Sequence, residues 1–401
     1  MRIVYLADGQ SPIARSWVEH FVRVGHEVHW ITTSNAAPDL PLASVVVAPV
    51  GFTGQASRGR SAGPMRLLRG ARALPLRVWI RHWLGPLTLS RAVRIVRQAI
   101  ADLQPDLVHA LRIPFEGMAA AVADPASPLL LSVWGNDFTF HAPSSPMMSR
   151  LTRRALARAD GLHADCQRDL RLARHWGYPD GRPTIVLPGN GGVRPEVFYP
   201  RGHAPEDPGP RLGPVLATLP DQAPVIINPR GFRAYVRSDT FFRAIPRVLQ
   251  RFPQAHFLCP AMARDPVAEG WLRRLNIETA VHLLPPLTPP EMASAFRCAD
   301  VAVSPSLHDG TPNSILEAMA CGCLPVVGDL ESLREWIDDG VNGLLTDATD
   351  PAALAQAVVR ALADPAWREQ AAHHNARIIA ERARYPDVMR AAEAFNHRLL
   401  G

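Results

Sequence analysis

The sequence predicts an α/β protein with two doubly wound domains, each built on a parallel β-sheet. Short apolar segments rich in Val, Ile and Leu alternate with amphipathic segments of helical length along the chain. This alternation occurs twice, once on each side of a stretch rich in Pro and Gly at residues 201–224. The chain has 401 residues, which is enough for two domains of ordinary size.

The first half begins with a strand, a loop, a helix and a second strand, which is the order of a βαβ unit in a parallel sheet. Seven strands are expected in this half, at residues 2–8, 27–33, 44–50, 107–111, 129–135, 161–165 and 184–189. Helices are expected after residue 12, at 90–101 and at 146–159. No G-x-G-x-x-G follows the first strand, so a dinucleotide-binding fingerprint is absent.

The second half repeats this architecture. Six strands are expected, at residues 225–229, 255–259, 281–284, 301–304, 324–328 and 343–346. Helices are expected near residues 239–252, 266–275, 290–298, 313–321, 331–339 and 351–363. A last helical stretch covers residues 366–399, and Pro386 should break it.

The domain boundaries follow from these segments. Residues 1–200 are expected to form the first domain and residues 225–379 the second, with residues 201–224 as the linker between them. The final helix, about residues 380–401, is expected to pack back onto the first domain. Two doubly wound domains that face each other leave a central cleft at the carboxyl ends of their strands.

Composition limits the class of protein. The five cysteines are too few and too scattered for a disulfide framework, and reduced cysteines suit the cytosol. No secretory signal is evident, and no apolar run is long enough to span a membrane. A cytoplasmic protein is therefore expected. The net charge is +6 and the chain contains no lysine, so a phosphate-binding cation must be an arginine.

A strongly basic segment lies in the first half. No Asp or Glu occurs from Leu40 to Ala101, and ten arginines fall between Arg58 and Arg97 with Trp and Leu interleaved. Basic residues beside Trp and Leu favour an anionic membrane surface, so a peripheral location on the inner membrane face is one interpretation. A solvated loop followed by an exposed helix face is the other. No nucleic-acid partner is predicted, because no RNA- or DNA-binding motif accompanies the charge.

Residues 304–328 combine three polar features. Asp309 lies in a loop that follows a strand, and backbone N–H groups near Asn313 and Ser314 are free at the expected start of a helix. Glu317 lies one turn further on the same helical face. A nucleotide sugar presents sugar hydroxyls, a diphosphate and ribose hydroxyls in the matching order. An ordinary strand–loop–helix with a solvated acid at each end is the alternative.

This segment resembles glycosyltransferase family 4. The resemblance is carried by Ser304-Pro-Ser, the run Asp309-Gly-Thr-Pro-Asn-Ser-Ile-Leu-Glu317-Ala-Met-Ala, Gly322, Pro325-Val-Val and Asn342-Gly-Leu-Leu. The family is marked by two acids separated by seven residues, the spacing of Asp309 and Glu317, although its first acid is usually Glu. Weaker similarities occur at Gly25-His-Glu-Val, Pro105-Asp-Leu-Val-His109, Ala159-Asp160 and Pro188-Gly-Asn-Gly. The resemblance implies a GT-B fold, in which two Rossmann-like domains face a central cleft.

The resemblance also implies roles in the second domain. Glu317 would bind the nucleotide ribose, and Asp309 would lie near the donor sugar. The helix start around Gly310, Thr311, Asn313 and Ser314 would bind the diphosphate. A basic pair after the first strand of this domain would also bind the diphosphate. Arg230 matches its first member, and Arg237, with Arg233 as second choice, stands in for a lysine.

The first domain departs further from the family pattern. Many members have His-Gly where this chain has Trp134-Gly135-Asn136-Asp137, so Trp134 is expected either to stack on a ligand ring or to pack in the core. Asn136 and Asp137 are candidate substrate contacts. Gly9 is a third candidate, because a glycine-rich first loop is reduced to this one residue. His109 is a further candidate, with a satisfied strand-end histidine as its alternative interpretation.

The resemblance implies a retaining, metal-independent transfer of a hexose-type sugar from a nucleoside diphosphate sugar such as a UDP-sugar. The acceptor would be a glycan or a lipid-linked molecule of surface polysaccharide or glycolipid synthesis. No cofactor is expected, and the chain has no Asp-x-Asp motif for a metal–diphosphate complex. Two other functions stay open: a nucleotide-sugar 2-epimerase of the same fold, and an inactive membrane-associated subunit.

Overall fold

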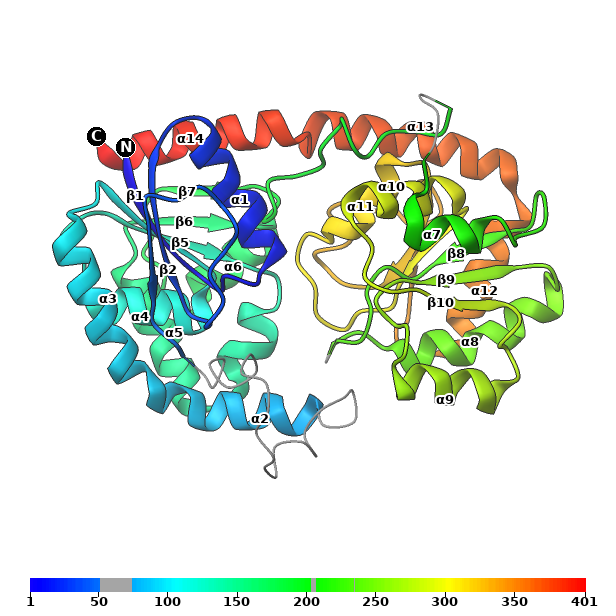
Figure 1. Ribbon diagram of the computed structural model, residues 1–401, viewed down its shortest axis with the longest axis horizontal. Helices are drawn as coiled ribbons and strands as arrows, with labels where there is room; N and C mark the ends of the chain where they lie inside the picture. The colour runs from blue at the N-terminus through cyan, green and yellow to red at the C-terminus, as the bar shows by residue number, and fades with distance from the viewer. Residues whose placement is uncertain (51–73, 203–206, 234) are drawn as a thin grey trace. The chain divides into compact units, whose positions relative to one another are not determined.

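The computed structural model describes residues 1–50, 74–202, 207–233 and 235–401 (Figure 1). These residues form two compact units. The first unit comprises residues 1–50, 75–192 and 386–401, and the second comprises residues 193–385. Each unit is built on one parallel sheet, so the predicted α/β class with two parallel-sheet domains is confirmed. No helix in the described ranges combines the length and the apolar character that a membrane crossing requires.

The sheet of the first unit has seven strands in the order β3-β2-β1-β4-β5-β6-β7, all parallel. All seven predicted strands are present: β1 (Arg2–Ala7), β2 (Glu27–Thr32), β3 (Ser44–Val47), β4 (Leu107–Leu111), β5 (Leu129–Val133), β6 (Gly161–Ala164) and β7 (Thr184–Val186). The four central strands β1, β4, β5 and β6 are almost completely buried, which explains their continuous apolar sequences.

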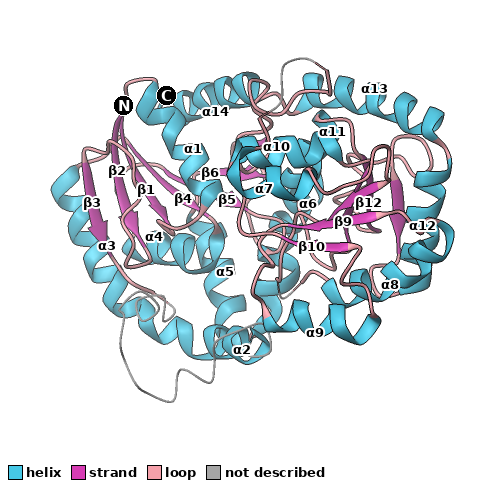
Figure 2. Cartoon of the chain, turned by 45° about the vertical axis from the view of Figure 1, so that its right-hand side comes forward, coloured by secondary structure: helices cyan, strands magenta, loops and turns pink. Residues whose placement is uncertain are grey.

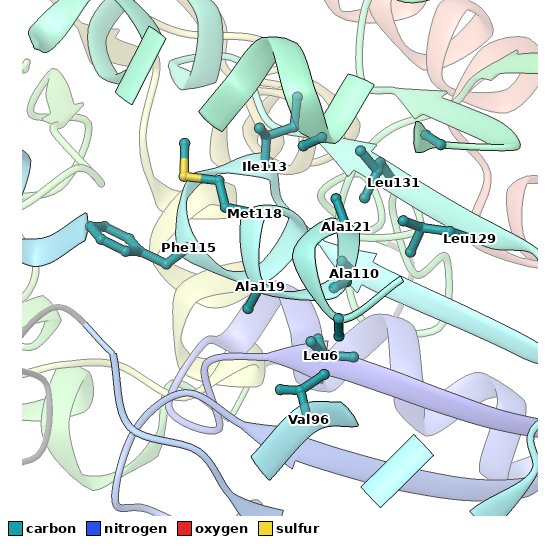
Figure 3. Packing of buried hydrophobic residues seen from close by; sticks show 14 of the residues in the cluster. Leu6, Val96, Ala110, Ile113, Phe115, Met118, Ala119, Ala121, Leu129 and Leu131 are labelled. Carbon is teal, nitrogen blue, oxygen red and sulfur yellow. The ribbon is translucent and has the colours of Figure 1, made fainter. Parts of the chain in front are cut away.

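Helices pack on both faces of this sheet. They are α1 (Pro12–Arg23), α2 (Leu74–Leu84), α3 (Leu89–Leu103), α4 (Met118–Ala123), α5 (Pro146–Arg158), α6 (Gln167–His175) and α14 (Tyr385–Leu400). The sequence did not predict α2, α4 or α6. Side chains of α3 and α4 pack against the strands in one hydrophobic core, where Val96 of α3 lies near Leu6 of β1, and Ala110 and Leu131 lie beside α4 (Figure 3).

The sheet of the second unit has six parallel strands in the order β10-β9-β8-β11-β12-β13. All six predicted strands are present: β8 (Val225–Ile227), β9 (His256–Cys259), β10 (Val281–Leu283), β11 (Val301–Ser304), β12 (Leu324–Gly328) and β13 (Leu344–Thr346). The helices of this unit are α7 (Gly209–Leu216), α8 (Ser238–Arg251), α9 (Pro266–Leu275), α10 (Pro289–Cys298), α11 (Asn313–Ala320), α12 (Pro351–Ala363) and α13 (Pro365–Arg382) (Figure 2).

Two predictions about local structure are corrected. The helix expected at residues 331–339 is a series of turns over residues 331–336. Leu333 and Ile337 are buried at helical spacing, but the Asn342 amide oxygen accepts a hydrogen bond from the backbone N–H of Asp338 and holds the segment in turns. The expected linker at 201–224 contains helix α7, whose Leu212 is fully buried in the core of the second unit.

The long C-terminal helical stretch breaks where the sequence predicts. Helix α13 ends at Arg382, and α14 begins at Tyr385 with Pro386 in its first turn, where a missing N–H costs no helical hydrogen bond. Helix α14 belongs to the first unit, while α13 belongs to the second.

Candidate functional site

The strand order of the second sheet reverses between β8 and β11. Strands β9 and β10 are added in turn on one side of β8. The next strand, β11, pairs with the other side of β8. Ligands of doubly wound sheets bind in the crevice outside the carboxyl ends of the strands at such a point. Arg230 follows the carboxyl end of β8, and Asp309 follows that of β11, so the topology brings these two predicted residues together.

Backbone hydrogen bonds join the loops that follow these two strands. The N–H of Leu307 donates to the carbonyl of Tyr235 at 2.8 Å, and the N–H of Arg237 donates to that of Pro305 at 2.9 Å. Gly328 lets the end of β12 pack closely on the loop after β11, because a Cβ there would lie 2.4 Å from the carbonyl oxygen of Ser306. The loops that carry Arg230 and Asp309 are therefore held in register by the backbone.

Arg230 and Asp309 form a buried ion pair. Arg230 Nη2 lies 2.8 Å from Asp309 Oδ2, with 11% and 12% of the two side chains exposed. Burial disfavours the charge of Arg230, but Asp309 and Tyr235 together outweigh this effect, so the arginine pKa is raised. The Asp309 loop is fixed by Ser332, whose hydroxyl donates to the Asp309 carbonyl at 2.7 Å. Both groups are therefore held in place.

Polar atoms without partners surround this ion pair. The Nδ2 of Asn228, the Nε of Arg230 and the Oδ1 of Asn313 are buried and have no hydrogen-bond partner among the described residues. Asn228 is fully buried directly after β8, and its Oδ1 accepts the N–H of Arg230 at 3.1 Å. Unpartnered buried polar atoms are rare because each is costly, and several in one place indicate a site for a polar ligand.

Helix α11 begins beside Arg230. The Ser314 hydroxyl accepts a long hydrogen bond of 3.4 Å from Arg230 Nη1. Pro312 at the N-cap supplies no side-chain cap. The N–H groups of Asn313 and Ile315 donate to the carbonyls of Thr311 and Pro312, so the N–H of Ser314 is left for another acceptor. Gly310 and Thr311 are buried in the loop just before the helix. The structure thus brings together all the predicted residues of this loop with one guanidinium at a helix N-terminus, an arrangement suited to an anion.

Glu317 lies one turn into α11. Its carboxyl is half-buried, and burial raises its pKa to about 8, an effect that the positive charge of Arg194 partly offsets. No side-chain hydrogen bond to Glu317 occurs within the described residues. A carboxyl group that is desolvated and has no internal donor favours a ligand that brings hydroxyl donors to it.

The other two predicted arginines differ in their surroundings. Arg237 donates from Nε and Nη2 to the two carboxylate oxygens of Asp239, both at 2.8 Å. Asp239 fixes the orientation of this guanidinium and leaves its Nη1 side open. Arg233 is exposed. Of the two, Arg237 is the better ordered candidate for a second diphosphate contact.

The sheet of the first unit reverses its strand order between β1 and β4. Gly9 follows β1, but it is buried and its N–H donates to Thr32 Oγ1 at 3.1 Å. A Cβ at this position would lie 2.2 Å from the carbonyl oxygen of Ala36. We correct the expectation for Gly9: it allows two loops to pack closely and is not a substrate contact.

The segment after β5 is held by an arginine that the sequence did not single out. Arg112, directly after β4, pairs with Asp137 at 2.9 Å and donates to Asn136 Oδ1 at 2.9 Å. The other oxygen of Asp137 accepts the N–H groups of Ile113 and Trp134. Asp137 is 1% exposed with both oxygens engaged, so its predicted role in substrate binding is replaced by a structural one.

Trp134 and Asn136 remain at the surface of this edge. Trp134 is half-buried, packs on Gly189, and has the Arg112 guanidinium 5.6 Å from its ring centre. Its indole N–H has no partner among the described residues. The internal packing of the ring agrees with the core alternative, and stacking on a ligand ring stays a prediction. Asn136 is half-buried, with its Oδ1 bound to Arg112.

His109 is a core residue and not a substrate contact. It is 0% exposed in the middle of β4, and its Nε2 lies 2.8 Å from Ser132 Oγ, which in turn lies 2.8 Å from His163 Nδ1. Burial lowers the pKa of His109 well below its usual value, so this ring is neutral. The geometry supports a buried strand histidine whose Nε2 has a partner, while its Nδ1 has none among the described residues.

The basic segment is described in part. Arg58, Arg60, Arg66, Arg69 and Arg72 lie outside the described residues. Within the described part, Trp79 and Trp83 of α2 are 55% and 48% exposed and their rings stack at 6.1 Å. Leu84 and Leu87 are also exposed, as are Arg91, Arg94 and Arg97 of α3. The predicted combination of exposed apolar and basic side chains is thus present on α2 and α3.

One group of described residues has the composition of a metal site. Asp165, Cys166 and Asp169 are buried near one another after β6. Arg168 Nη2 donates to Asp169 Oδ1 at 2.7 Å and to the carbonyl of Gly135 at 2.6 Å. A guanidinium therefore already supplies positive charge to this group, which makes a metal ion unnecessary there.

Comparisons with known proteins agree with this fold. Residues 8–189 match the model of the glycosyl transferase 4-like domain, and residues 224–364 match that of glycosyl transferases group 1. A D-inositol 3-phosphate glycosyltransferase of Nocardiopsis dassonvillei is 28% identical over 225 residues, which are 53% of this chain and 50% of the relative. The chain spans about half the length of the curated relatives it matches.

Two solved structures resemble the whole chain. Sucrose-phosphate synthase from Thermosynechococcus elongatus has a TM-score of 0.75 at 17% identity, covering 100% of this chain and 99% of its own. Anabaena Alr3699/HepE in complex with UDP-glucose has a TM-score of 0.71 at 17% identity, covering 99% and 100%. At this identity, the likeness shows a shared fold.

Proposed function

Because the chain belongs to the GT-B glycosyltransferases, with a 4-like first domain and a group 1 second domain, we propose that it transfers a hexose-type sugar from a nucleoside diphosphate sugar to a glycan or lipid-linked acceptor. The transfer retains the configuration of the sugar and requires no metal ion. The acceptor belongs to surface polysaccharide or glycolipid synthesis, and the enzyme works in the cytoplasm, peripherally on the membrane.

One observation carries this proposal: the Arg230 guanidinium at the N-terminus of α11, surrounded by buried polar atoms that lack partners. When the bond between a sugar and a diphosphate breaks, negative charge grows on the leaving phosphate oxygens. Fixed donors at those oxygens stabilise the transition state more than the ground state. Arg230, Arg237 and the Ser314 N–H at the start of α11 supply such donors in the proposed mechanism, which does not assign a nucleophile to the protein.

The orientation of the donor follows from the two acids. Asp309 lies at the start of the loop and is proposed to face the sugar, while Glu317 lies one turn into α11 and is proposed to accept hydrogen bonds from the ribose hydroxyls. A UDP-sugar is the proposed donor class, supported by the structural neighbour Alr3699/HepE, which is described in complex with UDP-glucose. The base itself has no assigned contact in this chain.

A membrane surface is part of the proposal. The exposed Trp79, Trp83, Leu84 and Leu87 form an apolar patch on α2 and the turn after it, and exposed arginines of α3 follow in the chain. Tryptophan rings and leucines insert at the headgroup level of a bilayer, and each nearby arginine adds about 1 kcal/mol of attraction to anionic lipids. This combination supports binding to the surface that carries a lipid-linked acceptor.

The proposed function is tested in two steps. UDP-, GDP- and ADP-sugars are first screened for the donor that raises the melting temperature of the chain. That donor is then incubated with isolated membrane lipids, and the anomeric configuration of any glycosylated product is read by ¹H NMR. A product with the configuration of the donor supports the proposal. A product of inverted configuration, or a new nucleotide sugar formed without any acceptor, contradicts it.

A further inference from the structure

Glu116 lies where the strand order of the first sheet reverses. The proposed donor site lies at the corresponding reversal of the second sheet. It belongs to the irregular segment Ile113–Gly117, which follows the carboxyl end of β4 beside β1, where the strand order reverses. Thr33, directly after β2, reaches the same place, since its hydroxyl donates to Glu116 Oε1 at 2.6 Å. The crevice at such a reversal is the usual ligand position of a doubly wound sheet.

One oxygen of this carboxyl group is left without a donor. Glu116 is 2% exposed, and its Oε2 has no hydrogen-bond partner among the described residues. Burial raises the pKa of the group, and the charges of Arg112 and Arg81 offset this only in part. A buried carboxyl oxygen without a partner is costly to the folded state, and a ligand hydroxyl that donates to it removes that cost.

The backbone around Glu116 is strained. Arg112 has a φ of 129° and Phe115 has a φ of 70°. Residues other than glycine rarely adopt these backbone conformations. Such residues cost about 1–3 kcal/mol each and concentrate at ligand sites, where the surrounding structure enforces them. Here the enforcing contacts are those of Arg112 with Asp137 and Asn136. This backbone conformation keeps Glu116 close to the end of β4 and outside a regular helix.

A guanidinium accompanies the carboxyl group. The Arg81 side chain from α2 is half-buried, with its Cζ 4.8 Å from the centre of the Phe115 ring. Its Nε is buried and has no partner among the described residues. A donor without an acceptor therefore lies near an acceptor without a donor. A ligand group that carries both functions, such as the vicinal hydroxyls of a sugar or cyclitol, satisfies both atoms together.

We propose that Glu116 is a specificity-determining residue that binds a hydroxyl of a polyhydroxylated acceptor. The hydroxyl donates to Glu116 Oε2, and a neighbouring acceptor oxygen accepts from Arg81 Nε. The long Arg81 side chain moves to admit the ligand, while Thr33 and the strained segment hold the carboxyl group in position. This inference rests on the proposed function and adds to it that the first unit holds the acceptor.

The test follows the Glu116 carboxyl group by NMR in the full chain. Glutamate is labelled with ¹³C at the carboxyl carbon, and the resonance of Glu116 is identified as the one missing from the Glu116→Gln spectrum. The probes are myo-inositol, D-glucose and D-inositol 3-phosphate, each titrated to saturation. We expect at least one probe to shift this resonance saturably, and none of the three to shift that of the exposed Glu278. A Glu116 resonance unchanged by all three overturns the inference.

The variant gives a second readout. We expect Glu116→Gln to bind the responding probe about tenfold more weakly, as the loss of a charged hydrogen bond implies. Glu278→Gln, exposed in the second unit, should bind it as the unmodified chain does. If Glu116→Gln and Glu278→Gln bind the responding probe with the same affinity, the inference is contradicted. UDP binding is measured on the same samples, so a chain that binds UDP but shows no Glu116 response disproves the acceptor contact and leaves the donor site standing.

Discussion

Arg230 and Asp309 form a buried ion pair at 2.8 Å, at the point where the proposed donor diphosphate and donor sugar meet. The pair has two consequences. Without a ligand, Asp309 keeps the guanidinium in place beside the N-terminus of α11. When a diphosphate binds, the two anions share one cation. Asp309 therefore orients Arg230 and also competes with the ligand for it.

The free energy of unfolding should depend on whether both members of the Arg230–Asp309 pair are present. Arg230→Ala leaves a nearly buried carboxylate without its cation, so we expect it to lower the free energy of unfolding by about 3–5 kcal/mol. Arg230→Ala combined with Asp309→Asn should lose less than the single change, because no unpaired charge is left. Urea unfolding of the four proteins measures this. Additive losses would show that the two residues do not interact.

Removing the competing carboxylate should strengthen nucleotide binding. We expect Asp309→Asn to bind UDP about three- to tenfold more tightly, because a negative charge beside the anionic diphosphate is lost. Its turnover with a UDP-sugar should fall, since the proposed contact to the sugar is weakened. Asp239→Asn, which removes the partner of Arg237, is the matched control, with a smaller gain because Asp239 is more exposed. Weaker UDP binding in Asp309→Asn would contradict the competition.

The raised pKa of Glu317 predicts a pH dependence of donor binding. The ribose hydroxyls are proposed to bind the ionised carboxylate, and the pKa of this group is raised to about 8 in the free protein. Donor binding should therefore strengthen as the pH rises from 6 to 8, by about tenfold or more. UDP-glucose is the suitable ligand, because its diphosphate does not titrate in this range. Calorimetry at three pH values should show the trend in the unmodified chain and a flat profile in Glu317→Gln.

The same group predicts how stability depends on pH. The pKa of Glu317 is raised from its ordinary value of 4.5 to about 8 on folding, so the folded chain binds an extra proton between these values. Its contribution to stability is complete below about pH 4.5 and is lost as the pH approaches 8. The stability of Glu317→Gln relative to the unmodified chain should therefore rise between pH 5 and 8. If urea unfolding gives the same difference in the free energy of unfolding at every pH, burial does not raise the pKa of this carboxyl group.

The apolar patch on α2 predicts binding to anionic membranes. We expect the chain to float with vesicles that contain anionic lipid and to stay in solution with neutral vesicles. Replacing Trp79 and Trp83 together with Ser should abolish flotation without lowering the affinity for UDP. Val341→Ser, which changes an exposed apolar residue of the second unit, is the control and should float normally. If the double variant floats as well as the unmodified chain, α2 does not contact the membrane.

The fold could be predicted well because the strands are continuous apolar segments. All thirteen predicted strands occur within a few residues of their expected bounds. Helices were missed where apolar spacing is obscured, as in α6 with its charged composition, or where proline and glycine suggest a linker, as in α7. The segment at 331–339 shows the opposite error, because Leu333 and Ile337 mimic helical spacing in a series of turns.

The site in the second unit was easier to predict than that in the first. Asp309, Ser314 and Glu317 are close in sequence, so their spacing alone indicates a shared edge. Arg112 and Glu116 could not be found this way, because their roles depend on Asp137 and Thr33, which are distant in the chain. Gly9, Asp137 and His109 show a related effect, since the structure buries all three candidates. Residues at strand ends look alike in a sequence whether a neighbouring loop buries them or a ligand reaches them.

The central claim is that the edge formed by Arg230 and α11 binds a nucleoside diphosphate sugar, with Glu317 at the ribose. The most direct test is a calorimetric titration of UDP-glucose at pH 8 into the unmodified chain and into Glu317→Gln. We predict one binding site per chain and an affinity about ten- to a hundredfold lower in the variant, the loss expected for a charged hydrogen bond. Equal affinity in the two proteins, or no binding to the unmodified chain, would contradict the account.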